Sequence, residues 1–315
     1  MKTLKNMITL FIITTIACLS CQARTYNYNG KGKMIGNLEF AVVDKNCNSL
    51  HDLARQYNTG YDALLDANPH LSSDEDLKPG LVVYIPNKII LPKKIKPNTI
   101  LINTAEKRLF YYQSSTNTLY TFPVGVGRLD FPTPTGKMHI TQKRYKPTWN
   151  VPPGVLAEAH RNGFMDHPTT MPYGPKNPLG KYAIHLSAHS YLIHSTHNPD
   201  LIGTRNTSGC VNLYPEHIAI LYNMISVKTP VEIVNIPFKY ALTSQTLYLE
   251  RYPTLYDTSK AQDQANDSED IQSQISRIQQ YAHVETDYDL TKNKLDNLTN
   301  MLQNPVGYPV AIVPS

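Results

Sequence analysis

The sequence predicts a mostly β protein with a small α/β unit on either side of the β region. Between residues 99 and 238 the apolar runs are short, which is typical of strands rather than of long helices. The chain also holds 23 prolines and 21 tyrosines, residue types that suit strands and turns. Before and after this region, apolar residues recur at helical spacing, which predicts the two flanking units.

Residues 1–23 are typical of an export signal. Two lysines precede an uncharged apolar run from Ile8 to Leu19, and small residues two positions apart end the segment. The run is short for a bilayer span, so cleavage is predicted rather than a permanent anchor. Lipidation of Cys18 or Cys21 is ranked second, because neither cysteine has an aliphatic residue three positions before it.

The composition excludes several classes of function. The net charge of +5 falls to +3 once the two lysines of residues 1–23 are removed, and no basic block interleaved with aromatic residues indicates nucleic-acid binding. Without that segment only Cys47 and Cys210 remain, too few for the framework of a small disulfide-stapled protein. A single bridge between them stays open as an alternative.

A compact unit is predicted over residues 38–86, after a polar, glycine-bearing lead-in at 24–37. The predicted order is strand, helix, helix, strand. The helical stripes lie in SLHDLARQYN and GYDALLDANP, and LKPGLVVYIP supplies the closing strand.

This order and these motifs resemble a LysM domain. The resemblance implies binding to the N-acetylglucosamine-containing glycans of peptidoglycan, in a shallow groove whose candidate residues are Asn48, Ser49, Asn68 and Leu71. The family's Gly-Asp-Thr/Ser before the first helix is replaced by Cys47-Asn48-Ser49, although Ser49 is still expected to cap that helix. A spacer that only orients the next domain is the alternative.

The β region over residues 99–238 carries several strand candidates and one clear helix. The strand candidates are TILINTAEKRLFYYQ and TLYTFPVGVG as a pair, YAIHLSAHSYLIHS as a hairpin, and TPVEIVNIP as a later strand. The helix, EHIAILYNMI, follows Pro215, a favourable residue in a first turn.

Two segments border the β region. Residues 87–98 are rich in lysine and proline and predict a stiff, solvated linker. Residues 239–315 predict a small appended α/β element, with a flexible tail as the alternative. Its evidence is a strand pair, a final strand in GYPVAIVPS, and two helical stripes that need burial, formed by Ile271, Ile275 and Ile278 and by Leu295, Leu298 and Leu302.

The stretch TSGCVN holds a single cysteine, Cys210, in a glycine turn, and His194 ends a strand-like run sixteen residues earlier. A thiol of ordinary pKa is only about 3% ionised at pH 7. A cysteine nucleophile therefore needs a base that raises the thiolate fraction, a group that orients the base, and amides that face the oxyanion. His194 is the candidate base, and Gly209 permits a turn that aims the amides of residues 208–210 at one point.

This pattern resembles the catalytic domain of L,D-transpeptidases. The family signature is a histidine, a variable spacer, and Ser/Thr-His-Gly-Cys followed by Arg or Asn two positions on. Thr207, Gly209, Cys210 and Asn212 match it, whereas Ser208 stands where the family usually has histidine. Further matches are LINTAEKRLFYY, FPVGVGRLDFPTPTG, NPLGKYAIHL, YLIHST and VKTPVEIVN. The resemblance implies a β-sandwich-like fold with the cysteine beside one helix.

The resemblance also implies a reaction in the periplasm, sensitive to carbapenems and without a cofactor or metal. Cys210 attacks the bond between an L- and a D-centre of a peptidoglycan tetrapeptide, releases D-alanine and forms a thioester. His194 moves the proton, and the Ser195 carbonyl holds the other ring nitrogen of His194. An amine of another stem peptide, giving a 3→3 cross-link, or of an outer-membrane lipoprotein or other envelope protein then resolves the thioester.

Further substrate contacts are implied beside the reacting pair. Thr207, Ser208 and Asn212 are placed on the substrate side, with Asn212 mainly bracing the loop. Tyr182 and His185 are expected along the acceptor groove. The LysM and catalytic modules are expected to act separately.

Three alternative functions stay open. Water in place of an amine would make the same cysteine site an L,D-carboxypeptidase or amidase-type hydrolase. A catalytically idle protein would bind the wall through LysM alone, with Cys210 as a structural thiol. Four histidines between residues 185 and 197 suggest a metal site, but the helical His-x-x-x-His pair with an acid between, and a second cysteine near Cys210, are both missing.

Overall fold

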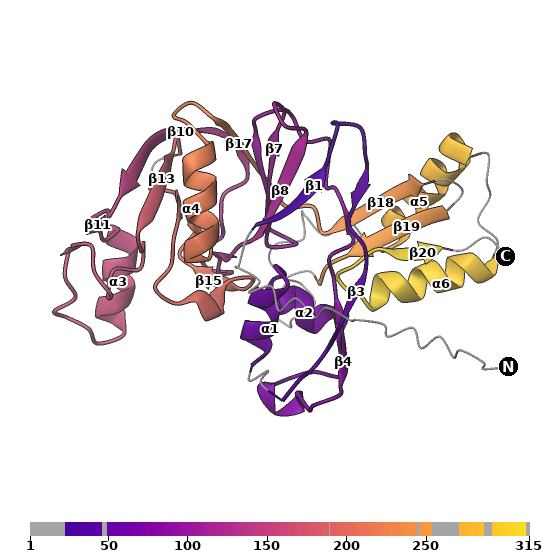
Figure 1. Cartoon of the computed structure of the whole chain (residues 1–315), viewed down its shortest axis with the longest axis horizontal. Coiled ribbons are helices and arrows are strands. Elements are labelled where there is room, and N and C mark those ends of the chain that lie inside the picture. The colour runs from indigo at the N-terminus through magenta and orange to yellow at the C-terminus, as the bar shows by residue number, and fades with distance from the viewer. Residues whose placement is uncertain are drawn as a thin grey trace, which may run out of the picture.

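The computed structural model describes residues 23–45, 49–188, 190–243, 246–253, 271–286 and 292–312. These residues form a mostly β molecule, as predicted (Figure 1). Nearly all of the predicted export signal lies outside them, and so do Cys18, Cys21, Cys47, Asn48 and His189. In the part of the chain that is described, no helix is long and apolar enough to cross a bilayer.

Nine strands form the largest sheet, in the order β1-β8-β7-β6-β17-β10-β13-β14-β16. Their bounds are Arg24–Asn27 (β1), Thr118–Pro123 (β8), Arg108–Gln113 (β7), Ile100–Asn103 (β6), Pro230–Val234 (β17), Gly136–Tyr145 (β10), Tyr182–Leu186 (β13), Leu192–His194 (β14) and Val211–Asn212 (β16). Strand β10 joins the two halves, because its first residues pair with β17 and the residues from Ile140 onward pair with β13. Both halves and helix α4 (Pro215–Met224) contribute to one apolar core (Figure 1).

The predicted pairings of the β region are confirmed, since β7 pairs with β8 and β13 pairs with β14, both antiparallel. The stretch TILINTAEKRLFYYQ, predicted as one strand, is instead two, β6 and β7, which pair with each other. Helix α4 begins at Pro215, also as predicted. Strand β10 and helix α3 (Pro153–Arg161) were not predicted. Only Ile140 of β10 and Ala159 of α3 are buried, so neither sequence carries the apolar periodicity that marks an element packed in a core.

The LysM unit has the predicted order. It consists of β3 (Glu39–Val42), α1 (Leu50–Gln56), α2 (Tyr61–Ala67) and β4 (Val82–Ile85), with a short 3₁₀ turn, η1 (Asp74–Asp76), before β4. Strands β3 and β4 pair antiparallel, and the helical stripes meet in a core of their own around Leu50 and Leu64. Ser49 caps α1 as expected, because its hydroxyl accepts the Asp52 amide at 3.0 Å.

Two predictions about the connecting segments are wrong. The lead-in at 24–37 contains strand β1 of the large sheet and strand β2 (Met34–Ile35). The segment 87–98 is not a free linker: its strand β5 (Ile89–Ile90) pairs with β2, and Ile89, Ile90 and Ile95 are each 1% exposed, whereas its lysines at 93, 94 and 96 are exposed. Ile89 and Ile95 share a core with residues of β7 and β8, so burial of their apolar area holds the segment against the sheet.

The residues after the β region form the predicted α/β element. Three strands, β18 (Phe238–Thr243), β19 (Thr246–Arg251) and β20 (Val310–Ile312), make a separate sheet. Helices α5 (Ile271–Thr286) and α6 (Lys292–Gln303) accompany this sheet (Figure 1). The predicted stripes supply its core, which includes Ile275, Ile278, Leu298 and Leu302.

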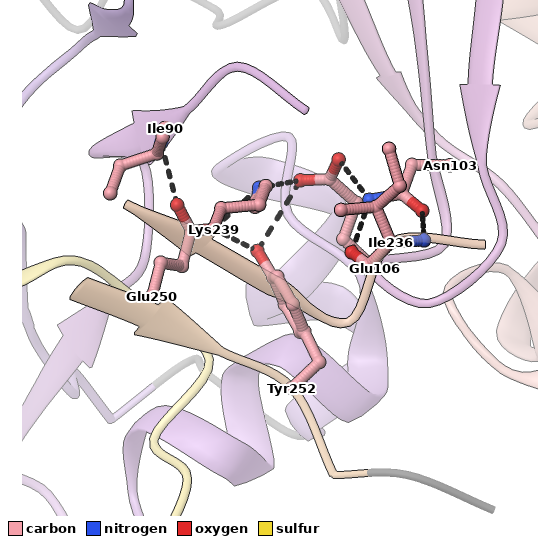
Figure 2. A network of polar contacts seen from close by, with 7 residues as sticks. All are labelled: Ile90, Asn103, Glu106, Ile236, Lys239, Glu250 and Tyr252. Atoms are coloured by element: carbon pink, nitrogen blue, oxygen red, sulfur yellow. Dashed lines mark hydrogen bonds and ion pairs between the residues drawn. The ribbon is translucent and has the colours of Figure 1, made fainter. Parts of the chain in front are cut away.

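A buried polar network ties this element to the rest of the molecule (Figure 2). Lys239 Nζ lies 2.7 Å from Glu106 Oε2 and 3.0 Å from Glu250 Oε1. The Tyr252 hydroxyl donates to Glu250 Oε1 at 2.5 Å, and the Ile90 amide donates to Glu250 Oε2 at 2.6 Å. Two carboxylates thus share one ammonium, and burial raises the pKa of Glu250. The network joins the C-terminal element, strand β5 and the turn after β6.

Candidate active site

The site is built where strands β14 and β16 lie side by side. The two strands are parallel, with Ile193 opposite Val211 and His194 opposite Asn212. Ile193 and Val211 both belong to the apolar core. Because side chains alternate along a strand, His194, Asn212 and Cys210, which directly precedes β16, project from the other face. All three line one pocket there.

Gly209 shapes the turn before the cysteine. Its φ is +101°, and a Cβ at this position would lie 2.7 Å from the ring of Tyr191, so no other residue fits without displacement. The Thr207 hydroxyl accepts the Gly209 amide at 3.2 Å and donates to the Cys210 carbonyl at 2.5 Å. Thr207 itself is held by β15 (Arg205–Thr207), which pairs with β9 (Val126–Gly127). The Gly209 amide therefore faces Thr207 instead of the common point expected for the amides of residues 208–210.

His194 is held in one orientation at the end of β14. Its Nδ1 lies 2.5 Å from the Ser195 carbonyl oxygen, the contact that the family resemblance implies. Nδ1–H is thereby the donor, which leaves Nε2 as the acceptor of the neutral ring. The side chain is 6% exposed, and burial lowers the pKa of His194 to about 4, with a smaller lowering effect from His197 and partial compensation by Ser195.

Cys210 is a free, half-buried thiol. Its Sγ donates a weak hydrogen bond to the Ser190 carbonyl at 3.9 Å. Burial raises the pKa of the thiol to about 11, against a smaller lowering contribution from the Leu192 backbone. The expectation that the histidine raises the thiolate fraction is not met, because a buried neutral imidazole supplies no charge that would stabilise a thiolate. The resting pair is neutral thiol and neutral imidazole.

The pocket in front of the pair has a volume of about 370 Å³. One wall comes from the excursion between β10 and β13, which contains β11 (Trp149–Asn150), α3 and β12 (Thr170–Met171). Arg128 holds α3 in place through two hydrogen bonds to Glu158, at 2.8 and 2.9 Å. The loop between His194 and Cys210 forms another part of the wall. The lining is Phe131, Trp149, Pro152, Gly154, Val155, Pro178, Leu179, Ser190, Tyr191, His194, Thr196, His197, Asn198, Leu201, Asn206, Thr207, Ser208, Cys210 and Asn212.

Tyr182 and His185, expected along the acceptor groove, do not line this pocket. Tyr182 packs against the core on the other face of β13, with its ring 4.9 Å from that of Tyr222. His185 lies opposite Leu192, so it is displaced along β13 from the level of His194. Asn212 has the bracing contact expected of it, because its amide donates to Asn206 Oδ1 at 3.1 Å.

Most of the apolar lining was not predicted from the sequence. Phe131, Trp149, Tyr191 and Leu201 come from four separate segments, and of these only Tyr191 stands in a motif with a histidine, YLIHST. Trp149 is the one tryptophan of the chain and lies in a polar stretch, which was the one usable signal.

The proposed glycan-binding residues of LysM are mostly structural. The Asn68 side chain is fully buried, where it donates to the Leu64 and Tyr84 carbonyls and accepts the Tyr84 amide, each at 2.8 Å. Leu71 is 5% exposed and belongs to the LysM core. Neither side chain is therefore available to a sugar, and the role of Asn68 and Leu71 as ligand contacts stays a prediction. Ser49 is engaged as the α1 cap, and Asn48 lies outside the described residues.

Among the residues that the structure describes, no three histidine, cysteine, aspartate or glutamate side chains are grouped closely enough to hold a metal ion. His185 and His197 therefore have no such cluster around them, and His189 is not among the described residues.

The chain is similar to known proteins over both modules. Residues 97–233 match the L,D-transpeptidase catalytic domain (YkuD), and residues 47–86 match the LysM domain. The chain is 35% identical over 234 residues to the probable L,D-transpeptidase YcfS of Escherichia coli strain K12, covering 73% of this chain and 72% of YcfS. It is 35% identical over 222 residues to the probable L,D-transpeptidase ErfK/SrfK of the same strain, covering 69% of this chain and 70% of ErfK/SrfK. A solved catalytic domain from the E. faecium L,D-transpeptidase matches at 20% identity with a TM-score of 0.32, over 45% of this chain and 99% of that chain.

The similarity to YcfS extends over more than two thirds of both chains. The chain belongs to the L,D-transpeptidase family, whose members are acyltransferases acting on peptidoglycan, and it carries a LysM domain.

Proposed function

We propose that this protein is a peptidoglycan L,D-transpeptidase that works through a thioester on Cys210. The observation that carries the proposal is the presence of a free thiol and an oriented, neutral imidazole in the lining of one pocket. A neutral imidazole with Nε2 available can accept a proton, and the pocket has room for a peptide stem.

In the first half-reaction the thiol proton passes to His194 Nε2 as Sγ bonds to the carbonyl carbon of the donor tetrapeptide. The C–N bond to the terminal D-alanine then breaks, and His194 returns the proton to the departing amine. The amides of Ser208 and Cys210 are the candidate donors to the oxyanion, since the Gly209 amide is engaged by Thr207.

In the second half-reaction an amine attacks the thioester carbonyl and gives its proton to His194. The C–S bond breaks, and His194 protonates the sulfur, which restores the thiol. The amine belongs to another stem peptide or to an envelope protein such as an outer-membrane lipoprotein. The LysM module would hold the enzyme on glycan strands in the periplasm, the compartment in which this polymer is accessible.

The test is the product formed from purified tetrapeptide muropeptides, analysed by mass spectrometry. We expect cross-linked dimers and released D-alanine, and neither with the Cys210→Ala variant. Tripeptides alone, lost in the same variant, would show hydrolysis by the same nucleophile instead. Unchanged tetrapeptide with the wild-type protein would contradict the proposal.

A further inference from the structure

The LysM helix α2 is docked against the catalytic loop. Its N-cap residue, Gly60, has no side chain to cap the helix. Instead, the Tyr61 amide donates to the Ile202 carbonyl at 3.5 Å, and the Asp62 amide donates to the Gly203 carbonyl at 3.4 Å. Both carbonyls belong to the loop between His194 and Cys210. That loop therefore supplies to the LysM helix the acceptors that a capping side chain usually provides.

Two glycines make this approach possible. A Cβ on Gly203 would lie 2.3 Å from Gly60 Cα, and a Cβ on Gly60 would lie 3.0 Å from Gly203 Cα. The two backbones are thus in direct contact, and a side chain at either position would have to push the helix and the loop apart.

The same loop forms part of the pocket. Leu201, at the end of the short turn η2 (Pro199–Leu201), lines the cavity. In the sequence it directly precedes Ile202 and Gly203, whose carbonyls accept the α2 amides. The Leu201 carbonyl accepts from Asn206 Nδ2 at 2.6 Å, and Asn206 Oδ1 accepts from Asn212 Nδ2 at 3.1 Å. A continuous line of contacts therefore runs from the LysM helix to Asn212, two residues after Cys210.

Another contact holds the LysM module at a point away from this loop. Arg55 of α1 makes two hydrogen bonds of 2.8 Å to Glu216 of α4. Breaking the Arg55 pair loosens the module without touching residues 199–206. This pair provides a matched control for the contact made by Gly60.

We propose that LysM helix α2, through Gly60, is a positioning element of the acyl-transfer site: it holds the loop that forms the Leu201 wall of the cysteine pocket. The two modules do not act separately, because moving α2 moves the loop. Gly60 touches no reacting atom. The inference rests on the proposed function only for its kinetic consequence, since the docking itself is a property of the fold.

The test compares the full-length variants Gly60→Ala and Gly60→Val with Arg55→Gln and Ser49→Ala. Gly60 has φ −82°, so neither substitution strains its own backbone. The second-order rate of Cys210 acylation by imipenem is expected to fall on the order of 10-fold or more for Gly60→Val and less for Gly60→Ala. Hydrogen exchange of residues 199–206, read by mass spectrometry, is expected to accelerate in the same order. The two controls, which perturb LysM elsewhere, are expected to stay within about twofold of wild type in both measurements.

The inference would be overturned if Gly60→Val showed the same hydrogen exchange and the same acylation rate as wild type. It would also be overturned if Arg55→Gln and Ser49→Ala lost acylation to the same extent as Gly60→Val. Absence of any imipenem adduct on the wild type would refute the proposed function instead. In that case the exchange of residues 199–206 still decides whether α2 holds the loop.

Discussion

His194 and Cys210 line one pocket as two neutral groups. With the thiol pKa at about 11, only about one molecule in 10⁴ carries a thiolate at pH 7. In the proposed mechanism the nucleophile is therefore generated during attack, by proton transfer to His194, and is not stored as an ion pair. The placement of Cys210 and His194 in one pocket, and the Gly209 turn, could be predicted from the sequence. The protonation state could not, because it depends on how deeply His194 and Cys210 are buried by segments distant in sequence.

The first prediction concerns the pH dependence of acylation. Protonated His194 cannot accept the thiol proton, so activity is lost as pH falls through the pKa of His194, which burial lowers to about 4. The second-order rate of imipenem acylation is expected to stay level from pH 8 to about pH 5, where an ordinary histidine of pKa about 6.5 would already be protonated. A stopped-flow profile with its acid limb near pH 6.5 would contradict this assignment.

The second prediction separates the base from a structural role. In His194→Gln the amide can still donate to the Ser195 carbonyl, but it cannot take a proton. Acylation is expected to slow about 10²–10⁴-fold while the melting temperature stays near that of wild type. A large drop in melting temperature, measured by calorimetry, would mark His194 as a structural residue.

Single elements differ in how much of them the sequence reveals. Helix α4 and the hairpins carry apolar periodicity and turn residues, and they were predicted closely. Strand β10 is mostly polar and exposed, and it is a strand because β17 and β13 flank it on both sides. Segment 87–98 was predicted to be solvated because it is rich in lysine. The sequence of the segment does not show that a face of the sheet covers Ile89 and Ile95. In these cases tertiary contacts override local composition.

The third prediction concerns Asn68, at the end of α2. Asn68→Leu leaves the Tyr84 amide and two carbonyls without their partner in a buried place, so it is expected to destabilise LysM by about 2–4 kcal/mol. Ser49→Ala, which removes only the α1 cap, is expected to cost about 1 kcal/mol. Urea denaturation of both variants measures the difference. Loss of affinity for sacculi by Asn68→Leu at unchanged stability would restore Asn68 as a ligand contact.

At the scale of the whole molecule, the modules are joined by contacts that no local sequence pattern predicts. The Gly60–Gly203 approach and the network around Lys239 each link residues more than a hundred positions apart. The sequence showed the modules and their order, because each has its own periodicity and motifs. It did not show how they dock, since docking is a property of surfaces that form only after folding.

The fourth prediction concerns the network that ties the C-terminal element to the sheet. Lys239→Met leaves Glu106 and Glu250 buried together without a cation, so it is expected to lower the free energy of unfolding by about 3–5 kcal/mol. The control is Lys93→Met, which breaks a partly exposed pair with Glu232 and is expected to cost at most about 1 kcal/mol. Equal losses in the two variants, measured by denaturation, would show that the network contributes no more than a surface pair.

The proposed mechanism depends most on one nucleophile at one position. Intact-mass measurement after incubation with imipenem, followed by peptide mapping, tests it directly. We expect a single adduct on the Cys210 peptide of the wild type, slow formation in His194→Gln, and none in Cys210→Ala. An unmodified wild-type protein, or an adduct that persists in Cys210→Ala, would contradict the account.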